Sequence, residues 1–522
     1  MTDQSIYLLE VGADTGAGVV TLRYASRGYV TKPGDTPANT HYEARLLNGG
    51  IGRIEQHMFG RGRTMGQAVM SLGDIRLANA DDGLNALRSY IFDGQTARLL
   101  RLDSISSAYA DAEIIYVAVI EELDWSDSDT PVLKFYDLRR LLDVPLLTER
   151  YAGTTTGGGQ NTADGSPDIE GQIKPHVWGK VLNVEVTFAN PYDVVLQVSD
   201  GAVNSITLYD GGVAITGDGD DGSISALIAA SQNPGHYRTA LTLGLLKPGG
   251  SVSGRPAFVW TTDVTEGATS ALNRAGAVVT RILNHVGYSG ATWLDEASFT
   301  TLDASATAEV GVFVNSEDSA ISVIRKILGS VGAYLTVTAG GKFSVGQFVG
   351  VEASLGVLIA SDNDIIGSFG AASNPDTEAG LPAARLRLRY GKYWRQHGSS
   401  DVGGCVATSD PERADALGRE WREVSVENAS IISDHPLAQD LEFETYIVSK
   451  ADAEAERTRL NALYGVAREV VTVTVTREKA ASATLGSSWT ISPDRLSFSK
   501  DMVVIGRETD PNAETVTLVM WG

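Results

Sequence analysis

Short runs of β-branched and aromatic residues, separated by Gly, Asp and Asn, recur along most of the 522-residue chain. The first of them are Ser5–Val11, Val19–Ala25, Thr96–Leu102 and Glu113–Trp125. Such runs suit pleated, half-buried strands, and the residues between them suit tight turns, so the pattern predicts a mainly β protein. At about 100–200 residues per domain, the length predicts three or four domains with separate cores.

Changes of period and composition divide the chain into five segments. Residues 1–150 predict a β-barrel or β-sandwich. Residues 151–168 are rich in Gly and Thr and have almost nothing apolar to bury, so they predict a linker or long loop. Residues 169–262 predict a small β domain, and residues 263–350 an α+β domain. Residues 351–522 predict a return to strands with two helices.

Helical spacing of apolar residues predicts the helices, and glycine-containing pairs predict hairpin turns. The helices are a short one capped by Asp82, one that carries Leu272 to Val286 and stops at Gly287, one from Ser316 to Gly332, one from Asp410-Pro411 that includes Leu417, Trp421 and Val424, and one capped by Ser449. The turns are at Asp200-Gly201, Asp210-Gly211 and Gly340-Gly341.

The charge balance and the cysteine count restrict the possible partners. Asp and Glu total 65 against 42 Lys and Arg, a net charge of -23, which opposes phosphate neutralisation but suits a passive conduit for DNA. A single cysteine, Cys405, allows neither an intrachain disulfide framework nor a multi-cysteine zinc site, and favours a reducing compartment. Residues 1–10 lack the features of a secretory signal, and no apolar run approaches the ~18 residues of a membrane span.

Nucleophilic chemistry has little support in the sequence. The histidines, at positions 41, 57, 176, 236, 285, 397 and 435, show no recognisable pairing with Ser or Cys, and no GxSxG elbow is present. Cys405 follows Gly403-Gly404 in what reads as a loop, with no base in view to activate its thiol. Paired carboxylates carry no specific signal, since 65 acidic residues produce close pairs by chance.

Ion and phosphate sites are also poorly supported. The run Asp218-Gly219-Asp220-Asp221-Gly222 resembles part of a calcium loop, but Ala229 stands where the bidentate Glu belongs, so a solvated turn is the prediction. Gly157-Gly158-Gly159 and Gly340-Gly341 lack the Lys-Ser or Lys-Thr ending of a phosphate loop. The sequence therefore assigns no catalytic, cofactor-binding or metal-binding residue.

A basic stretch alternates with apolar residues at positions 385–395. Arg385, Arg387 and Arg389 would share one face of a strand, with Lys392 and Arg395 following. We expect them to pair with an acidic surface on a neighbouring domain or subunit, with contact to nucleic acid as the alternative.

Three groups of turn-and-strand segments occur in a recognisable order. The first group is Asp35–Thr40 with Tyr42 and Arg45, then Gly73-Asp74-Ile75, Asp82-Gly83 and Phe92-Asp93-Gly94. The second is Lys174-Pro175 with Gly179 and Asn183, then Val198–Gly201 and Tyr209–Gly212. The third is Leu381-Pro382, Tyr390, Trp394, Leu485-Gly486, Val504–Arg507, Asp510 and the terminal Leu518–Gly522. In these segments the chain resembles the baseplate-hub or tail-tip hub proteins of long-tailed bacteriophages and prophages.

The resemblance implies a fold and a role, and no site residues. The implied fold is mainly β with an α+β insertion, with two related β-barrels, an N-terminal one in 1–150 and a C-terminal one in 351–522, besides the smaller β and α+β domains. Three chains would present six barrels in a ring, matching a sixfold tail tube above and a threefold fibre or spike below.

Such a hub would work as part of the virion, at the tail tip or baseplate, after synthesis in the host bacterial cytoplasm. It would close the tube before infection and provide the channel for DNA ejection, with the DNA passing through the lumen without specific binding. The implied partners are further copies of the chain, distal tail or tail tube proteins, the tape measure protein and central fibre or spike proteins. No enzymatic activity and no cofactor are implied.

Two other classes of function stay open. One is a tail-associated cell-wall hydrolase, since tail ends must cross peptidoglycan. The other is a carbohydrate-binding adhesin, since 18 Tyr and 8 Trp offer stacking platforms for sugars. Most of these rings, including Trp421 and Trp489, fall in apolar patterns and are expected in cores.

Overall fold

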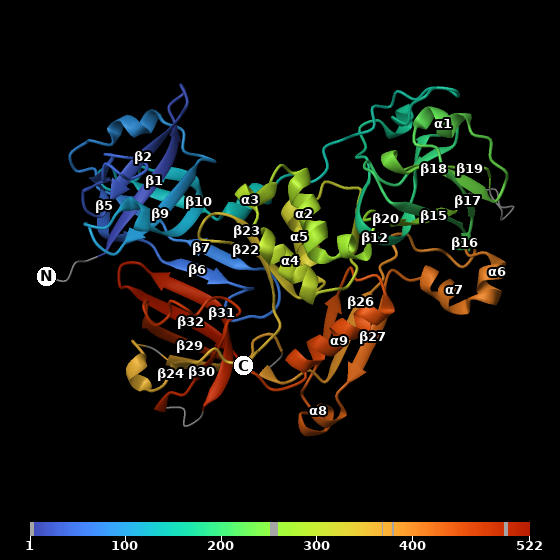
Figure 1. Cartoon of the computed structure of the whole chain (residues 1–522). Coiled ribbons are helices and arrows are strands. Elements are labelled where there is room, and N and C mark those ends of the chain that lie inside the picture. The colour runs from blue at the N-terminus through green and yellow to red at the C-terminus, as the bar shows by residue number, and fades with distance from the viewer. Residues whose placement is uncertain (1–4, 251–258, 368, 378–379, 495–498) are drawn as a thin grey trace.

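The computed structural model describes residues 5–250, 259–367, 369–377, 380–494 and 499–522. Its strands gather in several sheets, as the sequence predicts, and the helices between residues 275 and 329 lie near the middle (Figure 1). In Figure 1 the N-terminal sheet lies at the upper left and the C-terminal sheet below it, while the second β unit lies at the upper right.

The N-terminal sheet has the strand order β3-β4-β2-β1-β9-β10-β11-β8-β5. Alternating residues bury both faces of its centre: Leu9 and Leu99 belong to one core, and Leu8 and Leu100 to another. The end strands β3 and β5 are not paired with each other in the described residues, so the expected closed barrel is not confirmed. The strands are β1 (Ile6–Asp14), β2 (Val19–Ala25), β3 (Tyr29–Val30), β4 (His41–Ala44), β5 (Leu46–Ile51), β8 (Ile75–Leu77), β9 (Thr96–Leu102), β10 (Glu113–Asp124) and β11 (Val132–Tyr136).

The short helix expected after Asp82 is smaller than predicted. It is a 3-10 turn, η1 (Asn85–Ser89), and Asp82 lies before it with a φ of 59°, so it does not act as the N-cap. The sequence places Leu84, Leu87 and Ile91 on one apolar face of this helix; Leu84 and Leu87 are buried, whereas Ile91 is 58% exposed. A second 3-10 turn, η3 (Leu138–Leu142), ends the unit with Leu138 and Leu142 buried; a third, η2 (Tyr109–Asp111), precedes β10.

The second unit is a sandwich of two sheets, ordered β16-β15-β20-β12-β21 and β13-β14-β19-β18-β17. Its core takes Leu208 and Trp260 from the first sheet and Leu196 and Leu246 from the second. The strands are β12 (His176–Glu185), β13 (Thr187–Asn190), β14 (Val195–Gln197), β15 (Ser205–Asp210), β16 (Val213–Ala214), β17 (Thr216–Asp220), β18 (His236–Ala240), β19 (Leu245–Pro248), β20 (Trp260–Thr265) and β21 (Gly311–Val314); the helical pieces are α1 (Ile224–Ala229), η4 (Pro167–Ile169) and η5 (Leu241–Leu243).

The two predicted turns of this unit behave differently. Asp210-Gly211 makes the expected hairpin, since Asp210 pairs with Val213 and Gly211 has a φ of 55°. Asp200-Gly201 does not, because β14 and β15 belong to different sheets and the chain crosses between them there.

Hydrogen bonds within the segment 151–168, and from it to the second unit, fix its position. Gly153 N donates to Asp164 O at 2.9 Å, and Gly165 N donates to Ala189 O at 2.9 Å. The buried Tyr151 donates its hydroxyl proton to Gln197 at 2.7 Å. The segment is a loop without strands, as predicted, but these bonds fix its path, so it is not a free linker.

Helices α2, α4 and α5 and the hairpin β22–β23 form the α+β unit. The predicted helix that stops at Gly287 is α2, and Gly287 has the positive φ (93°) of a helix C-terminus. Leu272 lies before α2 and is 44% exposed, so it is not part of the apolar face. The elements are η6 (Ser270–Asn273), α2 (Ala275–His285), α3 (Gly290–Trp293), α4 (Glu296–Ser305), α5 (Ala320–Gly329), β22 (Ala333–Val337) and β23 (Phe343–Gln347). The helices α3 and α4 were not predicted.

The last part of the chain forms two separate sheets. One has the order β24-β30-β31-β32-β29-β25, and the other, β27-β26-β28, is covered by α9. Neither closes in the described residues, so a second barrel is not confirmed. The elements are β24 (Val357–Ile359), η7 (Asp362–Asp364), β25 (Phe369–Ser373), β26 (Arg385–Tyr390), α6 (Gly404–Ser409), α7 (Pro411–Leu417), β27 (Arg422–Glu427), α8 (Ala429–Asp434), β28 (Asp440–Glu444), α9 (Lys450–Tyr464), β29 (Glu469–Thr476), β30 (Ser488–Ile491), β31 (Lys500–Asp510) and β32 (Thr515–Trp521).

Both predicted C-terminal helices exist. Ser449 caps α9 by accepting a hydrogen bond from Asp452 N, and Asp410 caps α7 in the same way through Arg413 N. The second is shorter than predicted, because it ends at Leu417 and Val424 lies in β27. Of the helices in the described ranges, none has both the length and the apolar character that crossing a membrane requires.

Candidate functional site

The first and last parts of the chain meet in one sheet. The hairpin of β6 (Ile54–His57) and β7 (Val69–Leu72) leaves the N-terminal unit, and β6 pairs antiparallel with β31 from Ile54↔Thr509 to His57↔Gly506. In Figure 1 this hairpin lies between the two sheets. We call the region where it meets β31, the α+β unit and the end of the chain the terminal junction.

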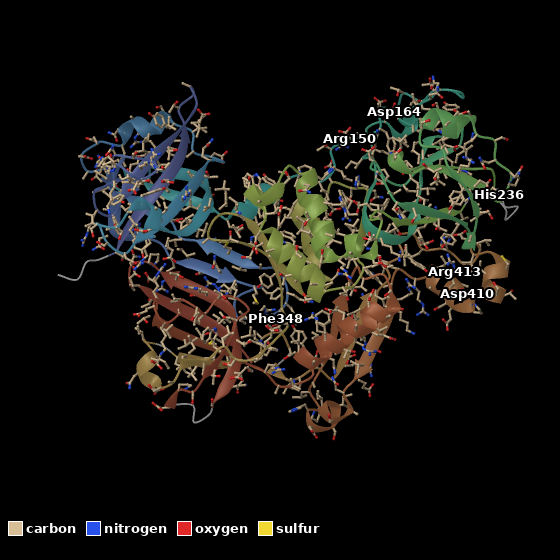
Figure 2. All side chains as sticks on the ribbon, in the orientation of Figure 1. Arg150, Asp164, His236, Phe348, Asp410 and Arg413 are labelled. Atoms are coloured by element: carbon tan, nitrogen blue, oxygen red, sulfur yellow. The ribbon has the colours of Figure 1, made fainter. Side chains whose placement is uncertain are left out.

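Aromatic rings fill the middle of the terminal junction. Phe348, which follows β23, meets Phe59 with ring centroids 6.3 Å apart and Trp521 with centroids 5.2 Å apart, both edge to face. Phe59 also meets Tyr334 at 5.8 Å. Figure 2 places Phe348 centrally, where the units converge. Phe59, Phe348 and Trp521 come from three parts of the chain, so the Phe348 ring connects all three parts.

A buried hydrogen-bond group supports the same region. Asp376 accepts from Thr64 N and from Thr64 Oγ1, both at 2.6 Å, and the Thr64 hydroxyl lies 3.0 Å from that of Tyr464 on α9. Burial raises the pKa of Asp376, and the two bonds from Thr64 oppose this rise.

A second polar group ties β1 to the β31–β32 turn. Glu514 accepts hydrogen bonds from Ser5 Oγ and Tyr7 Oη, both at 2.9 Å, and from Arg101 Nε at 3.2 Å. Burial raises the pKa of Glu514, but the three bonds together outweigh it and hold the pKa below its ordinary value. The carboxylate therefore stabilises the contact between the two sheets while it is ionised.

Two cavities open beside the terminal junction. One of about 640 Å³ is lined from β6, β10, β22 and β31, and another of about 780 Å³ lies next to β1, β29 and β32. Arg477 and Arg507 line both, and Arg477 is paired with Glu113 at 2.6 Å. Burial, and then the charge of Arg477, lowers the pKa of Arg507. Both cavities therefore carry charges of both signs, since Glu113 lines them beside the two arginines.

The predicted basic strand is β26, and its arginines do share one face. Their partners lie on the two flanking strands of the same sheet: Arg385 pairs with Glu427 at 2.7 Å, Arg387 with Asp440 at 2.8 Å, and Arg389 with Glu444 at 2.7 Å. The expectation of a partner on another domain or subunit is wrong for these three, because the ladder is satisfied within its own sheet. Arg395 pairs with Glu185 of the second unit at 3.3 Å, as expected of the stretch.

Lys392 has a different environment from the arginines. Its ammonium lies 4.5 Å from the ring centroid of Trp394 and 5.0 Å from that of Trp421, and 3.1 Å from the carboxylate of Glu420. Trp421 is half-buried against Tyr446, and Trp489 is half-buried against the C-terminal core. Trp489 therefore packs against a core as expected, whereas Trp421 packs against Tyr446 and Lys392 outside the hydrophobic cores.

The acidic run at 218–222 is mostly an edge strand, β17, rather than a turn. Asp218 meets His236 Nδ1 at 2.9 Å, Asp220 accepts from Leu241 N at 2.7 Å, and Asp221 pairs with Arg238 at 2.6 Å. Figure 2 shows His236 at the outer side of the second unit. Each carboxylate has a protein partner, which explains the run without an ion.

The remaining predicted residues are dispersed. Cys405 is exposed on α6 with a free thiol. Gly340-Gly341 makes the β22–β23 turn, as predicted, and Gly159 N donates to Asp193. His397 lies 3.3 Å from Asn183 in a buried contact. These residues do not converge on one site.

The terminal junction itself could not be assembled from the sequence. The alternation in β6 places Glu55 and His57 on one face, which is a readable signal. The pairing with β31 joins residues about 450 positions apart, and no local pattern specifies it.

Comparison with solved structures finds, among its matches, three tail proteins of low sequence identity. A tail protein from Neisseria meningitidis MC58 is 8% identical, with 99% of this chain and 97% of the other covered and a TM-score of 0.42. A tail protein of prophage MuSo2 from Shewanella oneidensis is 7% identical over 99% and 98%, with a TM-score of 0.41. Prophage tail protein gp18 from Listeria monocytogenes EGD-e is 7% identical over 94% and 93%, with a TM-score of 0.40. These are tail proteins, the class that the sequence resembles.

No protein-family model matches the chain, and no curated protein matches it.

Proposed function

We propose that this chain is a structural protein of a bacteriophage tail, and that within the tail it forms the baseplate or tail-tip hub. Support comes from the ordered segments that resemble hub proteins, and from where the fold puts them. Val504–Arg507 lies in β31, and Leu518–Trp521 in β32, both at the terminal junction.

The observation that carries the proposal is the joining of the first and last units in one sheet. A ring at the end of a tube must keep its modules in fixed relation while force passes through them. The β6–β31 hydrogen bonds, the Phe348 cluster and the Glu514 group provide such a connection within each chain.

The finer role is assembly as a homotrimer that closes the tail tube, joins it to fibre or spike proteins and becomes the channel for DNA. Three copies carry a formal charge of three times -23, or -69. An acidic lumen would repel DNA and let it slide without binding. The tube, tape measure and fibre proteins are the partners in this proposal.

Two measurements test it. Light scattering after size exclusion, alone and with the neighbouring tail proteins, is expected to give a species of three times 55.3 kDa, about 166 kDa, per ring. Cryo-electron microscopy of the particle is expected to place the chain at the tail end. A monomer under every condition would contradict the trimer, and a position on the tube wall or the capsid would contradict the hub.

A zymogram on bacterial cell walls separates the hub from a hydrolase. The hub proposal expects no clearing, and clearing that a substitution in this chain removes would replace it with an enzymatic function.

A further inference from the structure

A histidine and two carboxylates meet on the seam between β6 and β31. Glu55 and His57 alternate onto one face of β6, and Glu508 stands directly opposite Glu55 in the antiparallel register. One ligand atom from each of the three side chains lies within 4.8 Å of the other two. This cluster lies outside every feature on which the proposed function rests except the seam itself.

These charges lower the stability of the β6–β31 pair when no cation is bound between them. Like charges directly opposite on paired strands destabilise the pair, and Glu55 and Glu508 are such a couple. Their side chains are only 15% and 22% exposed, so water screens the repulsion incompletely.

His57 has no hydrogen-bond partner for either ring nitrogen. The side chain is fully buried (0% exposed), and its Nε2 lies 3.6 Å from Glu508 Oε1, beyond hydrogen-bond distance. A buried nitrogen without a partner costs about 1–3 kcal/mol.

The backbone fixes where the ring lies. A Cβ on Gly506, the cross-strand partner of His57, would come 2.1 Å from the ring Nδ1. The imidazole therefore lies directly against the main chain of β31 at Gly506, with Nε2 toward Glu508. The site is held by two paired strands and not by a loop.

We propose that Glu55, His57 and Glu508 bind a divalent transition-metal ion of the Zn²⁺ type, which clamps the N-terminal hairpin to the C-terminal sheet. One imidazole and two carboxylates form a mixed nitrogen and oxygen set that such ions accept. In a tetrahedral site with bonds of about 2.0–2.1 Å, ligand atoms lie about 3.4 Å apart. The Nε2 to Oε1 distance of 3.6 Å is close to that value. Water would fill the fourth position.

Arg61 offsets part of the negative charge of this site. Its guanidinium pairs with Glu55, and its side chain is 63% exposed. The cation offsets one carboxylate in the metal-free protein and competes with the metal for it. Removing the Arg61 charge should therefore strengthen metal binding, an effect that a purely structural cluster would not show.

The test is calorimetric titration of tag-free, EDTA-dialysed protein with Zn²⁺, and with Mg²⁺ and Ca²⁺ in parallel. We expect one Zn²⁺ per chain, at least about tenfold weaker binding in Glu508→Gln, and tighter binding in Arg61→Ala. The matched control is His236→Gln, which removes an exposed histidine paired with Asp218 and should bind like the wild type.

Zn²⁺ should also raise the unfolding temperature of the wild type, because an ion that binds the folded chain stabilises it. Circular dichroism shows whether Glu508→Gln and Arg61→Ala remain folded, which we expect because both positions are partly exposed. His57→Asn removes a second proposed ligand and is tested in the same way. The proposal is overturned if the wild type takes up no Zn²⁺, if His236→Gln loses it, or if Glu508→Gln and His57→Asn bind as well as the wild type.

Discussion

Phe348 offers the sharpest test of the terminal junction. Its side chain is 2% exposed and lies against Phe59 and Trp521, so Phe348→Ala would leave a cavity among three parts of the chain. An aromatic side chain that buries about 200 Å² contributes about 5 kcal/mol at ~25 cal/mol per Å². Measured Phe→Ala changes in cores cost about 3–5 kcal/mol, which agrees with that figure.

The assay is differential scanning calorimetry of the whole chain, since several units need not unfold in one step. At about 2–4 °C per kcal/mol for a unit of 150–250 residues, Phe348→Ala should lower the transition that contains the junction by about 6–20 °C. Phe348→Leu, which keeps most of the volume, should cost at most about 1.5 kcal/mol. Leu437→Ala, at a residue 78% exposed, should stay within about 0.5 kcal/mol. A Phe348→Ala transition no lower than that of Leu437→Ala would refute the reasoning.

Two further predictions concern charge. The hydrogen bonds to Glu514 lower the pKa of its carboxyl group in the folded chain. The stability that the carboxylate contributes is therefore present above the ordinary glutamate pKa of about 4.3, and it is lost as the pH falls through the lower folded value. Glu514→Gln should thus lower the free energy of unfolding by about 1 kcal/mol near neutral pH, and by progressively less as the pH falls below about 4.3, as measured by urea midpoints. An equal cost at neutral and at acidic pH would contradict this. Arg387→Glu should cost about 1–2 kcal/mol, more than Arg387→Gln, because it puts a like charge between Asp440 and Glu442, and about 1 M NaCl should reduce the difference; a salt-independent cost would count against the ladder.

The sequence predicted well those elements whose cause is local. Ser449 caps α9 and Gly287 ends α2, because a side-chain cap and a left-handed glycine act within one turn of helix. The predicted length of the helix at Asp410 is too great. Trp421 and Val424 continue its helical spacing, but Val424 pairs with β26 in a sheet.

The sequence does not predict which distant strands pair with each other. The alternation in β26 indicated which face Arg385 and Arg389 share, but not that the neighbouring strands would supply the carboxylates. Neither the crossing at Asp200-Gly201 nor the pairing of β6 with β31 leaves a local trace, because a strand carries its period and not its partner. For the same reason the His57 cluster had no complete signal in the sequence.

The β6–β31 pairing has a consequence for how the protein is made. The second half of β31 pairs with β32 on one side and, on the other side, with a hairpin synthesised some 450 residues earlier, so that hairpin has no partner strand until β31 has been made. A C-terminal fragment that begins after residue 350 lacks the hairpin, so it would expose an unpaired edge of β31. Expression of the C-terminal part alone should therefore yield aggregates, and co-expression with residues 1–150 should restore solubility.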